Sequence, residues 1–328
     1  STVTNANLTG SGTGASTTYS FPTAGTVYVY AILSPTSPDP ACRPYLVKSF
    51  VVAATPALTD PTDQVLCTGS TTSAVSLVAT PSATTSFAWT NSRTSIGLAA
   101  SGTGNIAAFT ATNYTNAPVT ATVVVTPSNT ESAGGTTVAC VGPTQSYTYT
   151  VNPIPTVNTV ADQNVCAGTA VTLPFSGFVA GTVFEWTNSN TAIGLAASGT
   201  GNLSYTATNT TSSPITATII VTPKYTNAGV TCTGNPISFT ITVNPTPTVA
   251  AVTNQVLCNG AATTAVAFTG ATTGTVYNWT NSNTSIGLAA SGTGDIASFT
   301  AVNTGATAAT ATITVTPTYT GAGFTCTG

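Results

Sequence analysis

The chain has 328 residues, of which 41% are hydrophobic and 3% are charged, with 7 acidic residues, 4 basic residues and no histidine. The net charge of −3 leaves no basic surface for phosphates, so nucleic acid is not an expected partner. No apolar run approaches the roughly 18–20 residues that span a bilayer, so we expect no membrane insertion. The hydrophobic content is too high for a disordered chain, and the abundance of Thr, Val and Tyr favours β-strands.

The first part of the chain resembles the later half of a repeated unit. Residues 1–55 align with the back halves of the units that follow and lack the Trp and first Cys of those units. The chain is therefore interpreted as a window on a longer repetitive polypeptide. Tyr28, Tyr30 and Ile32 replace the outward Thr residues of the other units. These three residues are a candidate contact surface, and an ordinary cross-strand aromatic pair is the alternative.

A block that begins with Trp-Thr-Asn and ends with Ser-Gly-Thr-Gly occurs three times. Its Trp residues, Trp89, Trp186 and Trp279, are 97 and 93 residues apart, so the chain is an array of units of about 95 residues. That length is typical of a β-sandwich module. The predicted domains are a partial repeat at 1–55, full repeats at 56–154 and 155–246, and a repeat at 247–328 that lacks its last strand.

The repeated block carries no chemistry that we recognise in its side chains. Each Trp follows an aromatic residue two positions earlier, which predicts a buried aromatic pair in the core of every unit. The Ser-Gly-Thr-Gly segment lacks the Lys and the helix of a phosphate loop. It is interpreted as a tight turn that needs positive φ angles.

Strands are predicted by the alternation of apolar and polar residues. In the first full unit the clearest case places Ala121, Val123 and Val125 on one face, with Thr residues on the other. The other predicted strands are 64–67, 163–166 and 255–258; 74–79, 170–175 and 265–268; the Trp-containing strands; and the closing strands 145–151 and 237–243. No helical period of useful length is present, so the fold is predicted to be all-β.

The cysteines recur with the array, and none has the spacing of a metal site. The separations within the units are 73, 66 and 68 residues, and one disulfide per unit is the simplest interpretation. The predicted pairs are Cys67–Cys140, Cys166–Cys232 and Cys258–Cys326, while Cys42 is expected to pair outside the chain. Disulfides of this kind place the protein outside the reducing cytosol.

The linkers between units contain alternating Pro residues, which favour extended and semi-rigid spacers. One linker contains Asp60 and Asp63, which make it a candidate Ca²⁺ site, but the other linkers carry no acid. Because calcium needs several oxygen ligands, a turn capped by Asp is the preferred interpretation and no metal is predicted.

The Trp block, the strand Thr-Ala-Thr-Ile-x-Val-Thr-Pro and the closing Phe-Thr-Ile-Thr-Val-Asn-Pro-x-Pro resemble the PKD-like repeats of giant Bacteroidota surface proteins. Those proteins include gliding adhesins exported by the type IX system. The resemblance covers every unit and implies tandem immunoglobulin-like sandwiches, an extracellular location and a stalk or adhesive role.

The expected function is therefore structural. The acids recur at no matching positions and there is no His, so no enzyme activity and no cofactor are predicted. The main hypothesis is the repeat region of a fibre or adhesin stalk on a bacterial cell surface, in which neighbouring repeats or other copies are the partners. The alternatives are a module that binds glycans or surfaces, and a filament subunit completed by strand exchange between copies.

Overall fold

The computed structural model describes residues 25–32, 45–82, 84–133 and 135–328. The chain divides into two compact units, one formed by residues 1–113 and 119–151 and the other by residues 114–118 and 152–328. Cys42 lies outside the described residues. For Tyr28, Tyr30 and Ile32 the description covers the backbone only.

The first unit contains a two-stranded sheet followed by one full repeat. Strand β1 (Gly25–Ile32) pairs with β2 (Tyr45–Val52), and this pairing sets Tyr28 opposite Ser49 and Tyr30 opposite Val47. The repeat is built from β4 (Gln64–Cys67), β6 (Thr85–Asn91), β7 (Ser101–Thr103), β8 (Val119–Ala133), β9 (Thr136–Val141) and β10 (Gln145–Asn152). Its main sheet has the order β4-β10-β8-β6-β7, with β9 paired to β8. A small second sheet joins β3 (Ala57–Leu58) to β5 (Ala79–Thr80).

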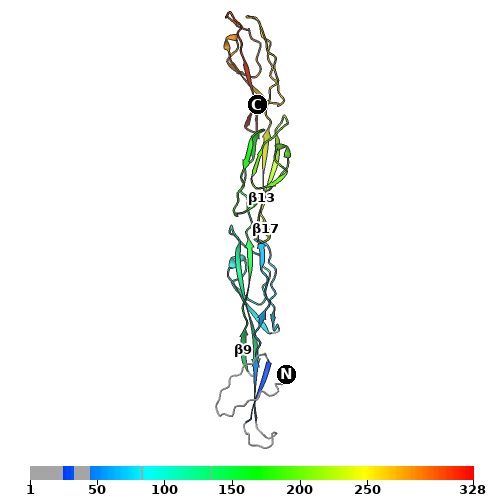
Figure 1. The fold of residues 1–328 in the computed structure, drawn as a ribbon, viewed down its shortest axis with the longest axis vertical. Helices are drawn as coiled ribbons and strands as arrows, with labels where there is room; N and C mark the ends of the chain where they lie inside the picture. The colour runs from blue at the N-terminus through cyan, green and yellow to red at the C-terminus, as the bar shows by residue number, and fades with distance from the viewer. Residues whose placement is uncertain (1–24, 33–44, 83, 134) are drawn as a thin grey trace. The chain divides into compact units, whose positions relative to one another are not determined.

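The main sheet of the second repeat has the same strand order, whereas its small second sheet is formed by other segments (Figure 1). Its strands are β11 (Gln163–Cys166), β12 (Ala170–Leu173), β13 (Val183–Asn188), β14 (Ser198–Thr200), β15 (Leu203–Thr206), β16 (Ile215–Asn227), β17 (Val230–Thr233) and β18 (Ile237–Asn244). The main sheet runs β11-β18-β16-β13-β14, and β12 pairs with β15 in the second sheet. Strand β11 is parallel to β18, whereas the other pairs are antiparallel.

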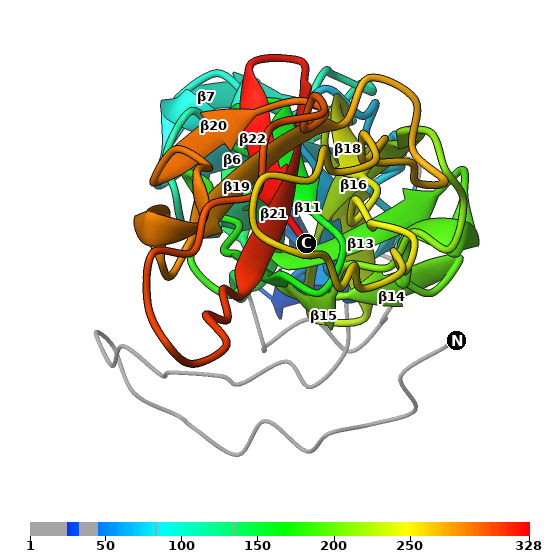
Figure 2. The same ribbon diagram turned by 90° about the horizontal axis from the view of Figure 1, so that it is seen from above.

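The third repeat has a smaller sheet in the order β20-β19-β21-β22 (Figure 2). Its strands are β19 (Val276–Asn281), β20 (Ser291–Thr293), β21 (Ile313–Gly321) and β22 (Phe324–Thr327). Among the described residues, no strand occupies the positions that β11 and β18 hold in the second repeat. The predicted all-β array of immunoglobulin-like sandwiches is confirmed.

The alternation predicted from the sequence forms the core. Ala217, Ile219 and Val221 on β16 are fully buried, as are Ile241 and Val243 on β18. Burying an aliphatic side chain of this size stabilises the fold by roughly 1.5–3 kcal/mol, so this face supplies much of the stability of the repeat. The three Trp residues are buried too, each in the core of its own repeat.

Several predicted strands differ from the observed ones. Residues 74–78 and 265–268 make isolated bridges at Val75 and Val266 instead of full strands, and Ala79 belongs to β5, whereas 170–173 form β12. Residues 255–258 form no strand. Their counterpart β11 is held by parallel pairing with β18, and the third repeat has no equivalent of β18 among its described residues.

Candidate functional site

The repeated block that begins with Trp-Thr-Asn forms a loop held in place by hydrogen bonds from its own Asn side chain. Asn188 is buried, and its Nδ2 donates to the carbonyls of Leu195 at 2.9 Å and Ala196 at 3.2 Å. Its Oδ1 accepts from the backbone N–H of Asn190 at 3.0 Å. Between these contacts lies a short 3₁₀ helix (Thr191–Ile193). Asn91 and Asn281 make the same contacts in the other repeats, a role that the sequence analysis did not assign.

The Ser-Gly-Thr-Gly segment is a short strand followed by one turn residue, not a turn throughout. In the second repeat Ser198–Thr200 forms β14, and Gly201 has a φ of +75°. Gly199 is needed for a different reason, since a Cβ there would meet the ring of Trp186 at 2.3 Å. The block is therefore conserved between the repeats by packing and backbone geometry rather than by chemistry.

The feature of the second unit that joins two repeats is a β-hairpin of the third repeat. Strands β21 and β22 are connected through Ala322 and Gly323, whose φ angles of +49° and +78° fit a type I′ turn. The pairing sets Cys326 opposite Tyr319. In the second repeat β16 and β17 form the same hairpin, which sets Cys232 opposite Tyr225.

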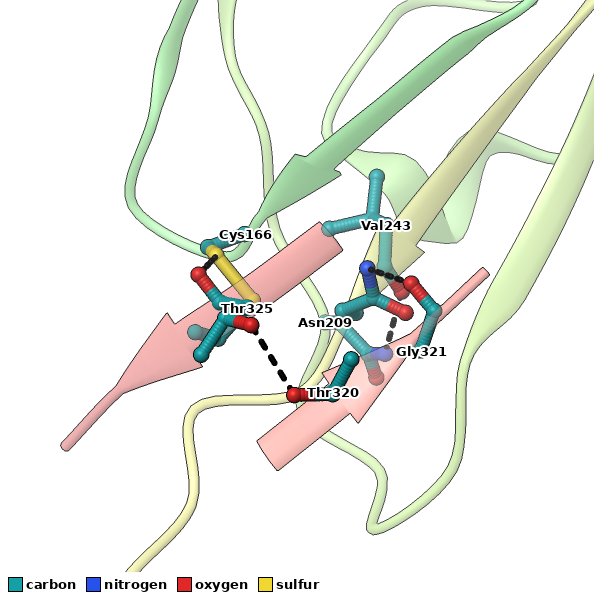
Figure 3. Close-up of a disulfide and its surroundings, with 8 residues drawn as sticks. Cys166, Asn209, Val243, Thr320, Gly321 and Thr325 are labelled. Atoms are coloured by element: carbon teal, nitrogen blue, oxygen red, sulfur yellow. Dashed lines mark hydrogen bonds between the residues drawn. A yellow bond between two sulfur atoms is a disulfide. The ribbon is translucent and has the colours of Figure 1, made fainter. Parts of the chain in front are cut away.

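A disulfide links this hairpin to the preceding repeat. Cys326 on β22 is bonded to Cys166, the last residue of β11, and their Cα atoms are 5.6 Å apart (Figure 3). The sulfur of Cys166 lies 3.8 Å from the carbonyl oxygen of Thr325. The Thr320 and Thr325 hydroxyls are 2.9 Å apart across the hairpin.

The predicted pairing within each repeat is wrong. Because Cys166 is bonded to Cys326, the pairs Cys166–Cys232 and Cys258–Cys326 do not form. Cys140 is a free thiol, which excludes Cys67–Cys140. Cys258 is also free, while Cys67 and Cys232 are both disulfide-bonded.

The strand register explains why the two cysteines of one repeat cannot meet. Cys166 is level with Asn244, next to the Val243–Ile215 pair at the start of β16. Cys232 is level with Tyr225, about ten residues further along β16, which corresponds to roughly 33 Å. A disulfide requires Cα atoms within about 7 Å. The two cysteines therefore occupy opposite ends of the repeat.

A buried asparagine lies beside the disulfide. Asn244 ends β18, is fully buried and donates through Nδ2 to the carbonyl of Gly321 at 3.5 Å (Figure 3). Its Oδ1 has no hydrogen-bond partner. Nearby, Asn209 Nδ2 donates to the carbonyl of Val243 at 2.8 Å.

An equivalent contact earlier in the second unit satisfies both polar atoms of the asparagine side chain. Asn152 Nδ2 donates to the carbonyl of Asn227 at 3.2 Å, and Asn227 Nδ2 donates back to Asn152 Oδ1 at 2.9 Å. Asn227 occupies the hairpin position of Gly321, which has no side chain to donate. The sequence signal for this contact is the recurring Val-Asn-Pro-x-Pro, whose Asn side chain carries no role when the segment is interpreted only as a linker.

The Pro linker packs against the hairpin of its own repeat. Gly328, after the hairpin cysteine, donates its N–H to the carbonyl of Pro317 at 3.0 Å. A Cβ at Gly328 would meet the carbonyl oxygen of Pro247 at 1.9 Å. Gly234 has the same relation to Pro155 and Pro223. The linker is therefore a packed part of the repeat as well as a spacer.

Titratable groups are scattered rather than gathered in one place. Burial raises the pKa of Tyr205 to about 12 and raises the pKa of Tyr147 and Tyr149 as well. The N–H of Thr240 donates to Asp162 Oδ1 at 2.6 Å and lowers the pKa of this carboxyl. Asp63 Oδ1 likewise accepts from the N–H of Thr148 at 2.6 Å, which is a contact with β10 rather than a cap of the turn that contains Asp63.

Within the described ranges, no three His, Cys, Asp or Glu side chains lie close enough to hold a metal ion. The helices in this part of the chain are single 3₁₀ turns, and none has the length or apolar character to cross a membrane. The junction between repeats, with its disulfide and buried Asn, is thus the most elaborate site described.

Comparison with known proteins finds similar architectures and no close relative. No protein-family model matches the chain, and no curated protein matches it. Among solved structures, immunoglobulin domains 1–5 of Sidekick-1 share 13% identity over 93% of this chain and 65% of that chain, with a TM-score of 0.34. The N-terminal eight immunoglobulin domains of Down Syndrome Cell Adhesion Molecule share 12% identity over 87% of this chain and 44% of that chain, with a TM-score of 0.32. The insect immune protein hemolin shares 13% identity over 86% of this chain and 77% of that chain, with a TM-score of 0.26.

Proposed function

We propose that the chain is an extracellular structural repeat region, the fibre or stalk of a large adhesin on a bacterial cell surface, and that it is not an enzyme. Its partners are the neighbouring repeats of the same polypeptide or other copies in a fibre. The observation that carries this proposal is the Cys166–Cys326 bond, which ties one repeat covalently to the next.

The bond supports both the location and the mechanical role. Structural disulfides persist in oxidising compartments and are rare in the cytosol. Under tension, a covalent bridge between repeats prevents the enclosed chain from extending even when the sandwich unfolds. The buried Asn contacts and packed linkers add resistance at the same place.

The surface chemistry is consistent with a passive stalk. With 3% charged residues, the molecule has few groups whose state changes with salt or pH. The outward faces of β16 and β18 carry Thr, including the pair Thr216–Thr242 with hydroxyls 2.9 Å apart. Such hydroxyls keep an uncharged surface hydrated.

The origin of the protein is a finer part of the proposal. The Trp block and the Val-Asn-Pro-x-Pro closing strands resemble the PKD-like repeats of Bacteroidota surface proteins. On that resemblance we assign the polypeptide to a surface protein exported by the type IX system.

Single-molecule force spectroscopy tests the mechanical role. In a chain with Cys67→Ser and Cys232→Ser, Cys166–Cys326 is the remaining disulfide among the described cysteines. Pulling on the two ends should leave the bridged segment unextended until reductant is added. The bond spans 160 residues, so reduction should add roughly 580 Å of contour length.

The alternatives give clearly different results. Pairing between Cys166 and Cys232 would enclose 66 residues and release only roughly 240 Å. The same chain with Cys166→Ser is the control and should extend equally with and without reductant. A chain that extends without unfolding peaks, as an unstructured polypeptide does, would contradict the stalk function.

A further inference from the structure

The cysteines of the array fall into two positions. We name the cysteine at the end of the first strand of a repeat the front cysteine, and the one on the hairpin the hairpin cysteine. The front cysteines are Cys67, Cys166 and Cys258, and the described hairpin cysteines are Cys140, Cys232 and Cys326. The Cys166–Cys326 bond joins the front cysteine of one repeat to the hairpin cysteine of the next.

The two free thiols follow from this arrangement. Among the described cysteines, Cys258 is the front cysteine of the last repeat and Cys140 is the hairpin cysteine of the first full repeat. Neither has a counterpart of the required kind among the described residues. The bonded cysteines, by contrast, are the front cysteines Cys67 and Cys166, each followed by another repeat, and the hairpin cysteines Cys232 and Cys326, each preceded by a full repeat.

The surface around Cys258 gives a second, independent observation. All four residues of β11, which precedes the bond at Cys166, are half-buried, and Val165 packs against the core. The matching residues 255–258 read Gln-Val-Leu-Cys and are exposed. Val256 is 98% exposed and Leu257 is 41% exposed. An apolar segment and a thiol thus lie together on the surface of the third repeat.

We propose that Cys258 forms a disulfide with the hairpin cysteine of a further repeat of this type, placed in series after the third repeat. The hairpin of that repeat would cover residues 255–258 as β22 lies against β11. Each disulfide of the array would then join a cysteine of one repeat to a cysteine of the next repeat. This inference concerns which cysteines of the array pair with each other, and it does not depend on the proposed stalk function.

The bond needs an external oxidant, which a small-molecule or protein disulfide supplies. The Cys258 thiolate attacks this disulfide, forms a mixed disulfide and releases one thiol. The thiolate of the hairpin cysteine then displaces the second thiol and leaves the new S–S bond. Two thiols lose two protons and two electrons, and the oxidant takes them up.

The test compares the 328-residue chain with a longer one. In the longer chain, a second copy of residues 235–328 follows Gly328, so that the closing strand, the linker and another repeat continue the register. The front cysteine of this copy is changed to Ser, and one Thr beside its hairpin cysteine is changed to Ser so that its hairpin peptide has a distinct mass. Both chains are refolded in a glutathione redox buffer, and the thiols are labelled with a maleimide and mapped by mass spectrometry. We expect labelling of Cys258 to fall at least about tenfold in the longer chain. A peptide linking Cys258 to the appended hairpin cysteine should appear in the monomer.

The controls separate pairing from folding. Changing the appended hairpin cysteine to Ser should restore the labelling of Cys258, while Cys166–Cys326 remains intact. Rapid labelling of Cys258 in the folded longer chain would overturn the proposal. Bonds between Cys258 of two copies, or bonds in trans while the longer monomer stays unpaired, would overturn it as well.

Discussion

The second and third repeats carry nearly the same sequence pattern but bury it differently. Ala217, Ile219 and Val221 on β16 are fully buried, whereas their counterparts Ile313 and Val315 on β21 are half-buried. The difference lies in the neighbouring strands, because β18 pairs with residues 215–221 of β16 and β11 adds a further strand beyond β18. On β21 the only described strand on the corresponding edge is β22, which pairs with residues 318–321 and leaves Ile313 and Val315 without a neighbour on that edge. The apolar face of a strand therefore specifies where a core forms, and the neighbouring strands decide how completely its side chains are buried.

The disulfide affects the two repeats unequally, and its loss is the largest effect that we expect. In the Cys67→Ser/Cys232→Ser chain, a further Cys166→Ser change removes a 160-residue loop, worth about 5 kcal/mol in the chain-entropy model. The third repeat, with its smaller core, should lose more protection than the second. Hydrogen exchange by mass spectrometry measures both. Cys258→Ser is the matched control and should change stability by less than about 0.5 kcal/mol.

Matched core truncations test the difference in burial directly. Ile219→Ala should destabilise the second repeat by about 2–5 kcal/mol, because it leaves a cavity in a closed core. Ile313→Ala at the equivalent, half-buried position should cost about half as much. Urea denaturation of each variant followed by local hydrogen exchange provides the comparison. Equal losses of unfolding free energy at the two positions would contradict the difference in burial between the two cores.

A gain of stability is expected where the two junction contacts differ. Gly321→Asn would place beside Asn244 the side chain that Asn227 places beside Asn152. A Cβ at position 321 would meet Asn244 Oδ1 at 2.5 Å, so the Asn244 amide has to turn and pair with the new side chain as Asn152 pairs with Asn227. Since Asn244 Oδ1 is buried without a partner, the N–H donor gained in this way should stabilise the junction by at most about 1 kcal/mol. Thermal unfolding of the variant measures the gain. Gly321→Ala, which adds bulk without a donor, is the control and should give none.

The smallest effect concerns pH. The N–H of Thr240 lowers the pKa of Asp162 below its ordinary value of 3.8, so its ionised form stabilises the second repeat. This contribution is complete above the ordinary pKa and is lost as pH falls through the lowered pKa of the folded state. The third repeat has Asn254 at this position and no such carboxylate. Carboxyl titration by NMR should show the low pKa, and Asp162→Asn should remove this part of the acid sensitivity.

Much of the fold was predictable because its signals are local. Alternation on β8 and β16, the buried Trp residues and the all-β class follow from residues that are close in sequence and lie on one face of a strand. The Trp of the repeated block was correctly predicted to be buried, whereas the packing of Gly199 against Trp186 and the locking Asn188 were not predicted.

The sequence by itself determined the array, its period, the positions of its long strands and the positions of its cysteines. It did not determine which cysteines meet, because equal spacing within each repeat is compatible with pairing inside a repeat or between repeats. Only the tertiary structure decided this, by placing Cys166 and Cys232 at opposite ends of one sandwich and Cys326 on the hairpin of the next. A disulfide depends on distance between strand ends, and that distance is set by docking rather than by spacing along the chain.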